Sequence, residues 1–165
     1  MRQRVHSVNR SSLQRGQGGF TLIELVVATA ILAILSMAAL PLARVQLRRA
    51  QEKELRIALR EIRTAIDNYK KAADQGRIQV ELGSDGYPPE LEDLVEGVEL
   101  LNTPDNKKLR LLRRIPRDPL TNSTEWGKRS YQDEPDSTAW GGENVFDVFS
   151  LARGTALDGT NYSEW

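Results

Sequence analysis

The chain has 165 residues, and its 23 Lys and Arg residues balance 23 Asp and Glu residues, which gives a formal net charge of zero. This balance argues against a nucleic-acid-binding protein, since such proteins are usually strongly basic. There is no Cys, and the single His is His6. Thiol nucleophiles, disulfides and Cys-ligated metal sites are therefore excluded, and a structural role is favoured over an enzyme.

The charges are unevenly distributed along the chain. Residues 1–19 carry +4, residues 20–43 carry −1, residues 44–75 carry +4 and residues 76–165 carry −7. This pattern predicts four segments: a basic leader (1–19), an apolar helix (20–43), a charged amphipathic continuation of that helix (44–75) and an acidic head (76–165).

The apolar segment is long enough to cross a membrane. Residues 25–43 are 19 consecutive residues without a charge, close to the ~20 that a transmembrane helix needs. The arginines before it predict a cytoplasmic N-terminus, with the head on the other side. A cleaved secretory signal is the alternative, because Ser36-Met37-Ala38 offers small residues for signal peptidase. However, the segment is longer than a usual signal core.

An amphipathic pattern continues directly after the apolar segment. Leu55, Ile62 and Tyr69 repeat at seven residues, and Gly76 supplies a stop. The apolar positions of the predicted buried face are Leu55, Ala58, Leu59, Ile62, Ala65, Ile66, Tyr69, Ala72 and Ala73. The predicted solvated face carries Arg48, Arg49, Lys53, Arg56, Arg60, Arg63, Asp67, Lys70 and Lys71. Residues 20–75 are thus predicted to form one helix of roughly 80 Å, which Pro41 should kink.

Glu24 is a single carboxylate near the start of the apolar segment. Placing a carboxylate at membrane depth costs about 2.5–3.5 kcal/mol, so it should have a cationic partner or lie at the interface. A new N-terminal amine would be such a cation, if the leader were cut just before Phe20.

The segment 18–25, GGFTLIEL, resembles the processing site of type IV pilins and type II secretion pseudopilins. The resemblance implies that prepilin peptidase cuts between Gly19 and Phe20 and methylates the Phe20 amine. It also implies that Glu24 pairs with the Phe20 amine of a neighbouring subunit, and it places Pro41 in the expected part of the helix. The alternative is that Glu24 only lies at the membrane interface.

The sequence of the head predicts a small α+β domain. A Tyr-Pro-Pro segment at 87–89 opens a short helix whose apolar side is Leu91, Leu94 and Val95. Residues 125–132 and 144–151 are predicted strands, separated by a turn over 133–142. This order, with the Pro-Arg-Asp-Pro segment at 116–119 and the final Trp165, resembles the major pseudopilin of type II secretion, the G subunit. The fold class is therefore expected to be α+β and type IV pilin-like.

The resemblance raises the question of calcium. G-type pseudopilins hold a calcium ion in the loop before the final Trp, where related pilins often use a disulfide. Here the corresponding loop supplies only Asp158 and Asn161 as ligands, and Arg153 would oppose a cation. No other cofactor is expected. The alternative is a loop closed by packing of Tyr162 and Trp165.

The resemblance implies a structural subunit of a homopolymeric filament, the pseudopilus, which drives export across the outer membrane. It would be a single-pass protein of the bacterial inner membrane with its head in the periplasm. The implied partners are prepilin peptidase, minor pseudopilins and the inner-membrane assembly platform. The alternatives are a type IV pilin or minor pilin for adhesion or motility, and a binding domain on an uncut membrane anchor.

Overall fold

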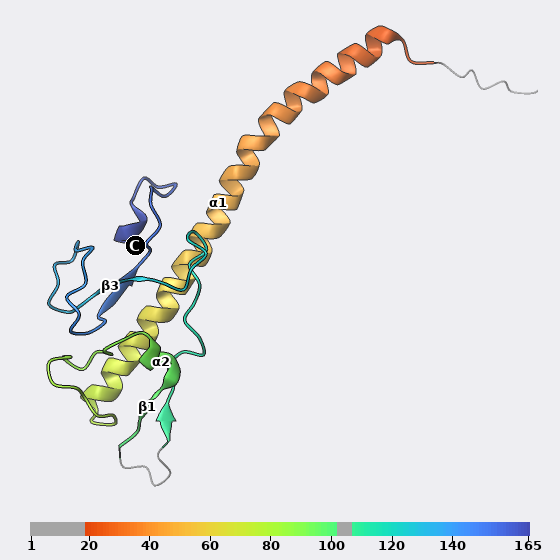
Figure 1. The fold of residues 1–165 in the computed structure, drawn as a ribbon. Coiled ribbons are helices and arrows are strands. Elements are labelled where there is room, and N and C mark those ends of the chain that lie inside the picture. Colours follow the sequence, from red (N-terminus) through yellow and green to blue (C-terminus); the bar gives the residue numbers. More distant parts are fainter. Residues whose placement is uncertain (1–18, 102–106) are drawn as a thin grey trace, which may run out of the picture. The chain divides into compact units, whose positions relative to one another are not determined.

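The computed structural model describes residues 19–101 and 107–165 (Figure 1). The chain divides into two compact units, Met1–Leu42 and Ala43–Trp165. Of the predicted leader, residues 1–19, only Gly19 lies within the described residues.

The first helix, α1, is Leu22–Asp74, 53 residues long. It confirms the predicted helix over 20–75, with ends that differ by one or two residues. Pro41 lies within α1, and the helix continues on both sides of it. Because proline has no N–H, one helical hydrogen bond is missing there.

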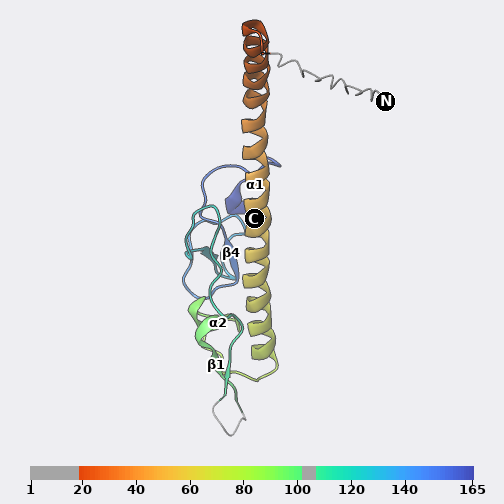
Figure 2. The same cartoon turned by 90° about the vertical axis from the view of Figure 1, so that its right-hand side faces the viewer.

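Within the unit Ala43–Trp165, one face of α1 forms the core of the head. All nine predicted apolar positions of this face are buried, and Leu55, Ile62 and Ile66 are at most 1% exposed. The rest of the head lies along one side of this part of α1 (Figures 1 and 2). Each fully buried Leu or Ile side chain stabilises the fold by about 1.5–3 kcal/mol, so this face accounts for much of the stability of the head.

The C-terminus of α1 is a Schellman motif, which the sequence indicated through Gly76. Gly76 has φ 64° and its N–H donates to the Ala73 carbonyl at 2.9 Å, while the N–H of Arg77 donates to the Ala72 carbonyl at 2.9 Å. Glycine adopts this left-handed conformation without strain. The helix therefore ends here, and the chain turns back along the buried face.

A second helix, α2 (Glu92–Glu96), and a small hairpin follow. The helix was predicted, and Leu94 is its buried side chain. Strands β1 (Val98–Glu99) and β2 (Lys108–Leu109) are antiparallel, with Val98 opposite Leu109. This pair was not predicted, because strands of two residues are too short to show alternation.

The second sheet consists of β3 (Gly127–Arg129) and β4 (Asp147–Phe149), which are antiparallel with Gly127 opposite Phe149. The sequence predicted longer strands over 125–132 and 144–151. β3 ends early because the N–H of Ser130 donates to the Asp133 carboxylate at 2.7 Å, and the N–H of Tyr131 donates to the Asn144 side chain at 3.0 Å. These backbone groups are therefore bound to side chains and not to a partner strand. The final element is a 3₁₀ helix, η1, Tyr162–Glu164.

The Pro-Arg-Asp-Pro segment is held in place by a buried acid. Asp118 is 0% exposed. Its carboxylate accepts hydrogen bonds from the Ser150 hydroxyl at 2.6 Å and from the N–H of Leu120 at 2.7 Å. Since buried carboxylates are stable only with such donors, Asp118 ties this segment to the residue after β4. Together the elements confirm the predicted α+β fold.

Candidate processing and assembly site

The predicted cleavage site lies just before α1. Gly19 and Phe20 have no regular secondary structure, and Phe20 is 76% exposed. A side chain added at Gly19 would have no atom within 4 Å. A peptidase could therefore reach the bond between these residues without unfolding the helix.

Glu24 lies in the first turn of α1, together with Thr21 just before the helix. The N–H of Glu24 donates to the Thr21 hydroxyl at 3.3 Å, which caps the helix. A carboxylate in a first turn also interacts favourably with the helix dipole. Within the described residues the Glu24 side chain forms no ion pair. The sequence reasoning missed the cap, although Thr-x-x-Glu is a known signature of a helix start.

The part of α1 that follows Glu24 presents an apolar surface. Leu32, Ile34 and Met37 are 62%, 68% and 75% exposed. The few hydroxyls are bound within the helix: Thr29 donates to the Leu25 carbonyl at 2.9 Å, and Ser36 donates to the Leu32 carbonyl at 2.7 Å. A helix with all polar groups satisfied internally is suited to lipid or to similar helices. Among the described residues, α1 is long and apolar enough to span a membrane.

In the other unit, the C-terminal loop is bound to α1 by polar side chains. Arg48 donates to the Thr155 carbonyl at 2.6 Å and to the Tyr162 hydroxyl at 3.2 Å. The Tyr162 hydroxyl in turn donates to the Glu52 carboxylate at 2.9 Å, and the same oxygen accepts the N–H of Leu157 at 2.9 Å. Burial raises the pKa of Tyr162. The phenol is therefore a hydrogen donor at neutral pH.

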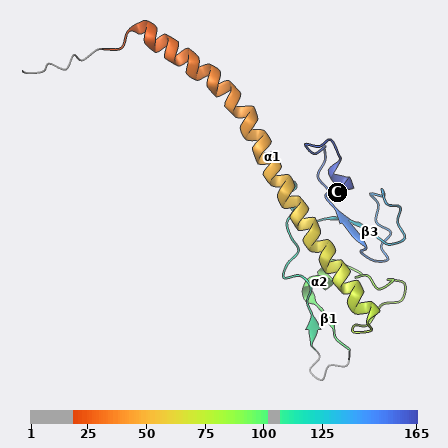
Figure 3. The same cartoon turned by 180° about the vertical axis from the view of Figure 1, so that it is seen from behind.

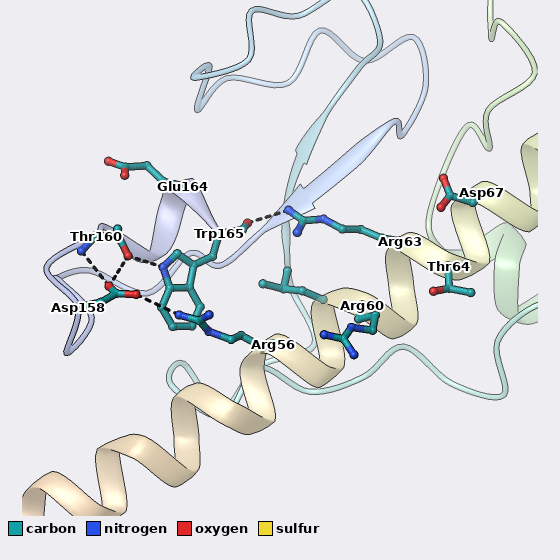
Figure 4. A pocket seen from close by; sticks show the side chains of 10 residues that line it. Arg56, Arg60, Arg63, Thr64, Asp67, Asp158, Thr160, Glu164 and Trp165 are labelled. Carbon is teal, nitrogen blue, oxygen red and sulfur yellow. Dashed lines mark hydrogen bonds and ion pairs between the residues drawn. The ribbon is translucent and has the colours of Figure 1, made fainter.

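A second set of contacts surrounds Trp165 (Figure 4). The Arg56 guanidinium lies over the Trp165 ring at 4.0 Å and donates to the Asp158 carboxylate at 3.1 Å. The other Asp158 oxygen accepts the Thr160 hydroxyl at 2.6 Å and the Thr160 N–H at 3.1 Å. The Thr160 hydroxyl also accepts the indole N–H of Trp165 at 2.6 Å. These hydrogen bonds, chiefly that from the Thr160 hydroxyl, hold the pKa of Asp158 below its ordinary value.

Arg63 links the loop to the sheet. It donates to the Asp147 carboxylate at 2.6 Å and to the Trp165 backbone oxygen at 2.8 Å. The predicted solvated face of α1 is exposed at Arg48 and Arg56 and partly exposed at Arg63, but all three side chains also bind the C-terminal part of the head, which the sequence did not indicate. No local pattern could have shown this, since the partners lie about a hundred residues away along the chain.

The predicted calcium ligands are both bound to other groups. Both Asp158 oxygens are engaged, one of them by a cationic guanidinium, and the Asn161 amide donates to Glu164 at 2.6 Å. Over the residues that the structure describes, no group of three or more acidic or His side chains could hold a metal. Calcium requires about six to eight oxygen ligands. This arrangement does not fit the ion, and removal of calcium with a chelator is the experiment that tests it.

Residues 14–40 match the family model described as a prokaryotic N-terminal methylation motif. The match covers the predicted cleavage site, Glu24 and most of the apolar segment. Comparisons with curated proteins and with solved structures gave no match. The motif supports a type IV pilin-like subunit, a structural and not a catalytic class of protein. It implies processing by prepilin peptidase, assembly into pilus-like filaments and a membrane anchor formed by the apolar helix.

Proposed function

We propose that this chain is the major pseudopilin of a type II secretion system. Cleavage between Gly19 and Phe20 releases residues 1–19, and the mature chain begins with an N-methylated Phe20. The chain lies in the bacterial inner membrane, with its head in the periplasm. The observation that carries the proposal is the methylation motif at residues 14–40, joined to an exposed apolar helix and an α+β head.

Filament assembly follows from the exposed surface of the apolar segment. Leu22, Ile23 and Leu35 are at least 61% exposed, so this surface must be covered by lipid or by other helices. When a subunit leaves the membrane, the apolar segments of neighbouring copies replace lipid. In that setting Glu24 pairs with the Phe20 amine of a neighbour, because either charge alone would be costly in the apolar filament core.

The secretion role is favoured over adhesion by the order of elements in the head. The Tyr-Pro-Pro segment, α2, the Pro-Arg-Asp-Pro segment and the β3–β4 sheet follow one another as in G-type pseudopilins. Prepilin peptidase, minor pseudopilins and the inner-membrane assembly platform would be the partners. The energy would come from the ATPase of the secretion system and not from this chain.

Deletion of the gene tests this proposal. Exported proteins should accumulate in the periplasm, and the wild-type gene should restore export and surface or periplasmic filaments. Loss of twitching or adhesion with export intact would instead indicate a type IV pilin. A chain that keeps its leader and never forms filaments would indicate a binding domain on an uncut anchor.

A further inference from the structure

A groove of about 570 Å³ lies beside the C-terminal end of α1. It is lined by Tyr69 of α1, by the chain that follows this helix, by α2 and by β1, and Figures 1 and 3 show these elements together at that end of α1. Its charged side chains are Glu81, Asp93 and Glu99, and none of the described residues that line it is a Lys, Arg or His. We call it the acidic groove.

Two of these carboxylates have no ionic partner. Glu81 and Glu99 are exposed, and neither forms an ion pair with a described residue. Lys108 is opposite Glu99 in the β1–β2 sheet, but it does not line the groove and forms no ion pair with Glu99. Asp93 is partly buried, and its carboxylate accepts the N–H of Glu90 at 3.0 Å. The groove therefore keeps negative charge that the described part of the chain does not neutralise.

A buried phenol opens into the same groove. Tyr69 is 4% exposed and lines the groove, and its hydroxyl forms no hydrogen bond with a described residue. Within the described part of the chain no fully buried polar side-chain atom lacks a partner, so this hydroxyl reaches the surface of the groove. Burial, and after it the charges of Asp93 and Glu81, raise the pKa of Tyr69. A protonated, unpartnered phenol near two carboxylates suits a ligand that carries positive charge and donates hydrogen bonds.

The groove fits an organic cation better than a metal ion. Over the described ranges, no group of three or more acidic or His side chains could hold a metal. Apolar side chains line the groove beside the carboxylates, and two of them, Val80 and Leu82, are 41% and 106% exposed. Lys and Arg side chains combine a charged end with an aliphatic stem, so they can contact both kinds of group.

The exposed side of α1 carries such side chains. Arg49, Lys53 and Ile57 follow one another at spacings of four residues, so they lie in one row on the helix, which we call the basic stripe. Arg49 and Lys53 are exposed, and neither forms an ion pair or hydrogen bond with a described residue. Ile57 is an apolar side chain that is 55% exposed. The stripe thus offers positive charge and apolar surface, as the groove offers negative charge and apolar surface.

The neighbouring acids of α1 do not neutralise this stripe. Glu52 and Glu54 are adjacent to Lys53 in the sequence, so each lies about 100° around the helix from it. Glu52 accepts the Tyr162 hydroxyl at 2.9 Å, and Glu54 lines a different groove of α1.

One molecule cannot place its own basic stripe in its own acidic groove. Tyr69 lies 16 residues beyond Lys53 on α1, which is about 24 Å along the helix and farther than a Lys side chain reaches. Both residues belong to the unit Ala43–Trp165, in which α1 fixes their separation. A parallel second copy, displaced by about this distance along the helix, would bring its Lys53 level with the groove.

We propose that the acidic groove receives Lys53 of a second copy of this chain. The ammonium binds the Glu81 and Glu99 carboxylates and donates to the Tyr69 hydroxyl. The proposal rests on the filament function proposed above and adds a specific contact between copies. Because the two surfaces differ, the contact is heterologous and repeats from copy to copy, as a helical filament requires. It should weaken at high salt, since the three charged side chains are exposed.

Charge exchange in the full-length chain, expressed with its assembly machinery, tests the contact. Lys53→Glu should lower filament yield about five-fold, and Glu81→Lys with Glu99→Lys should do the same. The three changes together should restore the yield to near the wild-type level. Tyr69→Phe removes only the hydroxyl and should lower the yield about two-fold. Its melting temperature in detergent should stay unchanged, because this hydroxyl has no partner among the described residues of its own chain.

Two matched variants control for the change of charge itself. Lys71→Glu reverses an exposed cation of α1 that is two residues after Tyr69, on the opposite side of the helix from the groove. Glu96→Lys reverses an exposed acid of α2 that does not line the groove. Both should assemble with the wild-type yield.

Cross-linking gives a second readout that does not depend on filament yield. The natural chain has no Cys, so introduced thiols are unambiguous. One tagged copy carries Ile57→Cys, one turn from Lys53, and a differently tagged copy carries Leu82→Cys, in the groove. We expect mixed dimers on oxidation or with a short bismaleimide, and fewer when Lys53→Glu is added to the first copy. Leu157→Cys in place of Ile57→Cys should give few, because Leu157 is exposed in the C-terminal loop.

The outcomes separate this contact from the filament function. Restored yield in the triple variant together with mixed dimers would support the contact. Wild-type filaments with undiminished yield from Lys53→Glu and no mixed dimers would overturn the contact and leave the filament function standing. A wild-type chain that forms no filaments would overturn both.

Two further outcomes would assign the groove to another occupant and overturn the contact. The first is a loss of yield in Glu81→Lys with Glu99→Lys that Lys53→Glu does not rescue, which would indicate a different basic partner. The second is a rise in the melting temperature of the wild type with calcium or magnesium that the same double variant does not show, which would indicate a metal ion.

Discussion

Glu24 has two separate reasons to occupy its position, and they can be distinguished by mutation. The first is local, because the Thr21 hydroxyl caps its N–H and a first-turn carboxylate favours the helix. The second is the proposed pairing with the Phe20 amine of a neighbouring copy. The local role is worth about 1 kcal/mol or less and concerns one molecule, whereas the pairing concerns assembly.

We predict that Glu24→Ala and Glu24→Gln leave cleavage and membrane insertion intact and prevent filament assembly. Removing the carboxylate eases insertion, but each incoming subunit then brings an unpaired ammonium into the apolar core. Glu24→Gln keeps the size and some hydrogen bonding, so failure there depends on charge. The measurement is filament yield by electron microscopy, with the mature N-terminus checked by mass spectrometry.

Thr21→Ala is the control for this prediction. It removes the capping hydroxyl, keeps the carboxylate, and should cost the helix about 0.5–2 kcal/mol without abolishing filaments. Wild-type filament yield from Glu24→Ala would remove the pairing role and favour a carboxylate that only tolerates the interface.

At the scale of elements, the C-terminal loop depends on side chains that come from α1. Four side chains of α1 bind five residues of this loop. The α1 side chains are those of Arg48, Glu52, Arg56 and Arg63, and the loop residues are Thr155, Leu157, Asp158, Tyr162 and Trp165. The loop has little regular structure beyond η1, so these contacts and the burial of Tyr162 hold it in place.

We predict that Arg56→Ala lowers the melting temperature of the full-length chain in detergent by about 2–5 °C. It removes the stacking on Trp165 and the ion pair with Asp158, which are partly exposed and hence modest. Lys71→Ala, another exposed cation of α1 that forms no ion pair with a described residue, should have no effect. An equal change in both variants would show that Arg56 does not hold the loop.

The same contacts predict a pH dependence. Because the pKa of Asp158 is lower in the folded chain than in the unfolded chain, its ionised form stabilises the fold. This contribution is present above the ordinary Asp pKa of about 3.9 and is lost as the pH falls through the lower, folded value. The difference in melting temperature between the wild type and Asp158→Asn should therefore be seen at pH 7 and should shrink as the pH falls below the ordinary Asp pKa of about 3.9. A difference that persists at low pH would contradict this assignment.

Calcium binding by this loop can be tested by removing the ion. Since Asp158 already binds Thr160 and Arg56, we predict that a chelator leaves the melting temperature of the wild-type chain unchanged. Magnesium serves as the control cation for any calcium added back. A fall of several degrees with chelator, restored by calcium alone, would show that the loop rearranges around the ion.

At the scale of the whole molecule, the helical spacing of apolar residues could be read from the sequence, and the contacts between residues far apart in the chain could not. The nine buried positions of α1 follow from helical spacing, and Gly76 marked its end. The β3–β4 sheet was located, but its strands were predicted too long, because side chains such as Asp133 compete for backbone donors. The acidic groove and the stacking of Arg56 on Trp165 join residues that lie far apart in the sequence. The local spacing of apolar residues carries no information about such contacts.

The processing site is the point at which the whole proposed function can be tested with one substitution. A side chain at Gly19 would contact nothing within 4 Å, and Gly19 precedes α1. Gly19→Leu therefore should not disturb the fold, so any loss of cleavage would report recognition by the peptidase. We predict that co-expression with prepilin peptidase shortens the wild-type chain by the 19-residue leader and leaves a methylated Phe20. Gly19→Leu should keep its leader, remain in the membrane and form no filaments.

Mass spectrometry of the N-terminal peptide decides between the remaining alternatives. A mature chain that begins at Ala39 would show an ordinary secretory signal, and the filament could not form because the apolar segment would be gone. A wild-type chain that retains residues 1–19 beside active peptidase would show an uncut anchor. With Phe20 at the mature N-terminus, its ammonium lies just before α1 begins at Leu22, and Glu24 lies in the first turn of that helix. In the proposed pairing, the ammonium of a neighbouring copy shifted along the filament axis binds Glu24, so we expect cleavage to precede assembly.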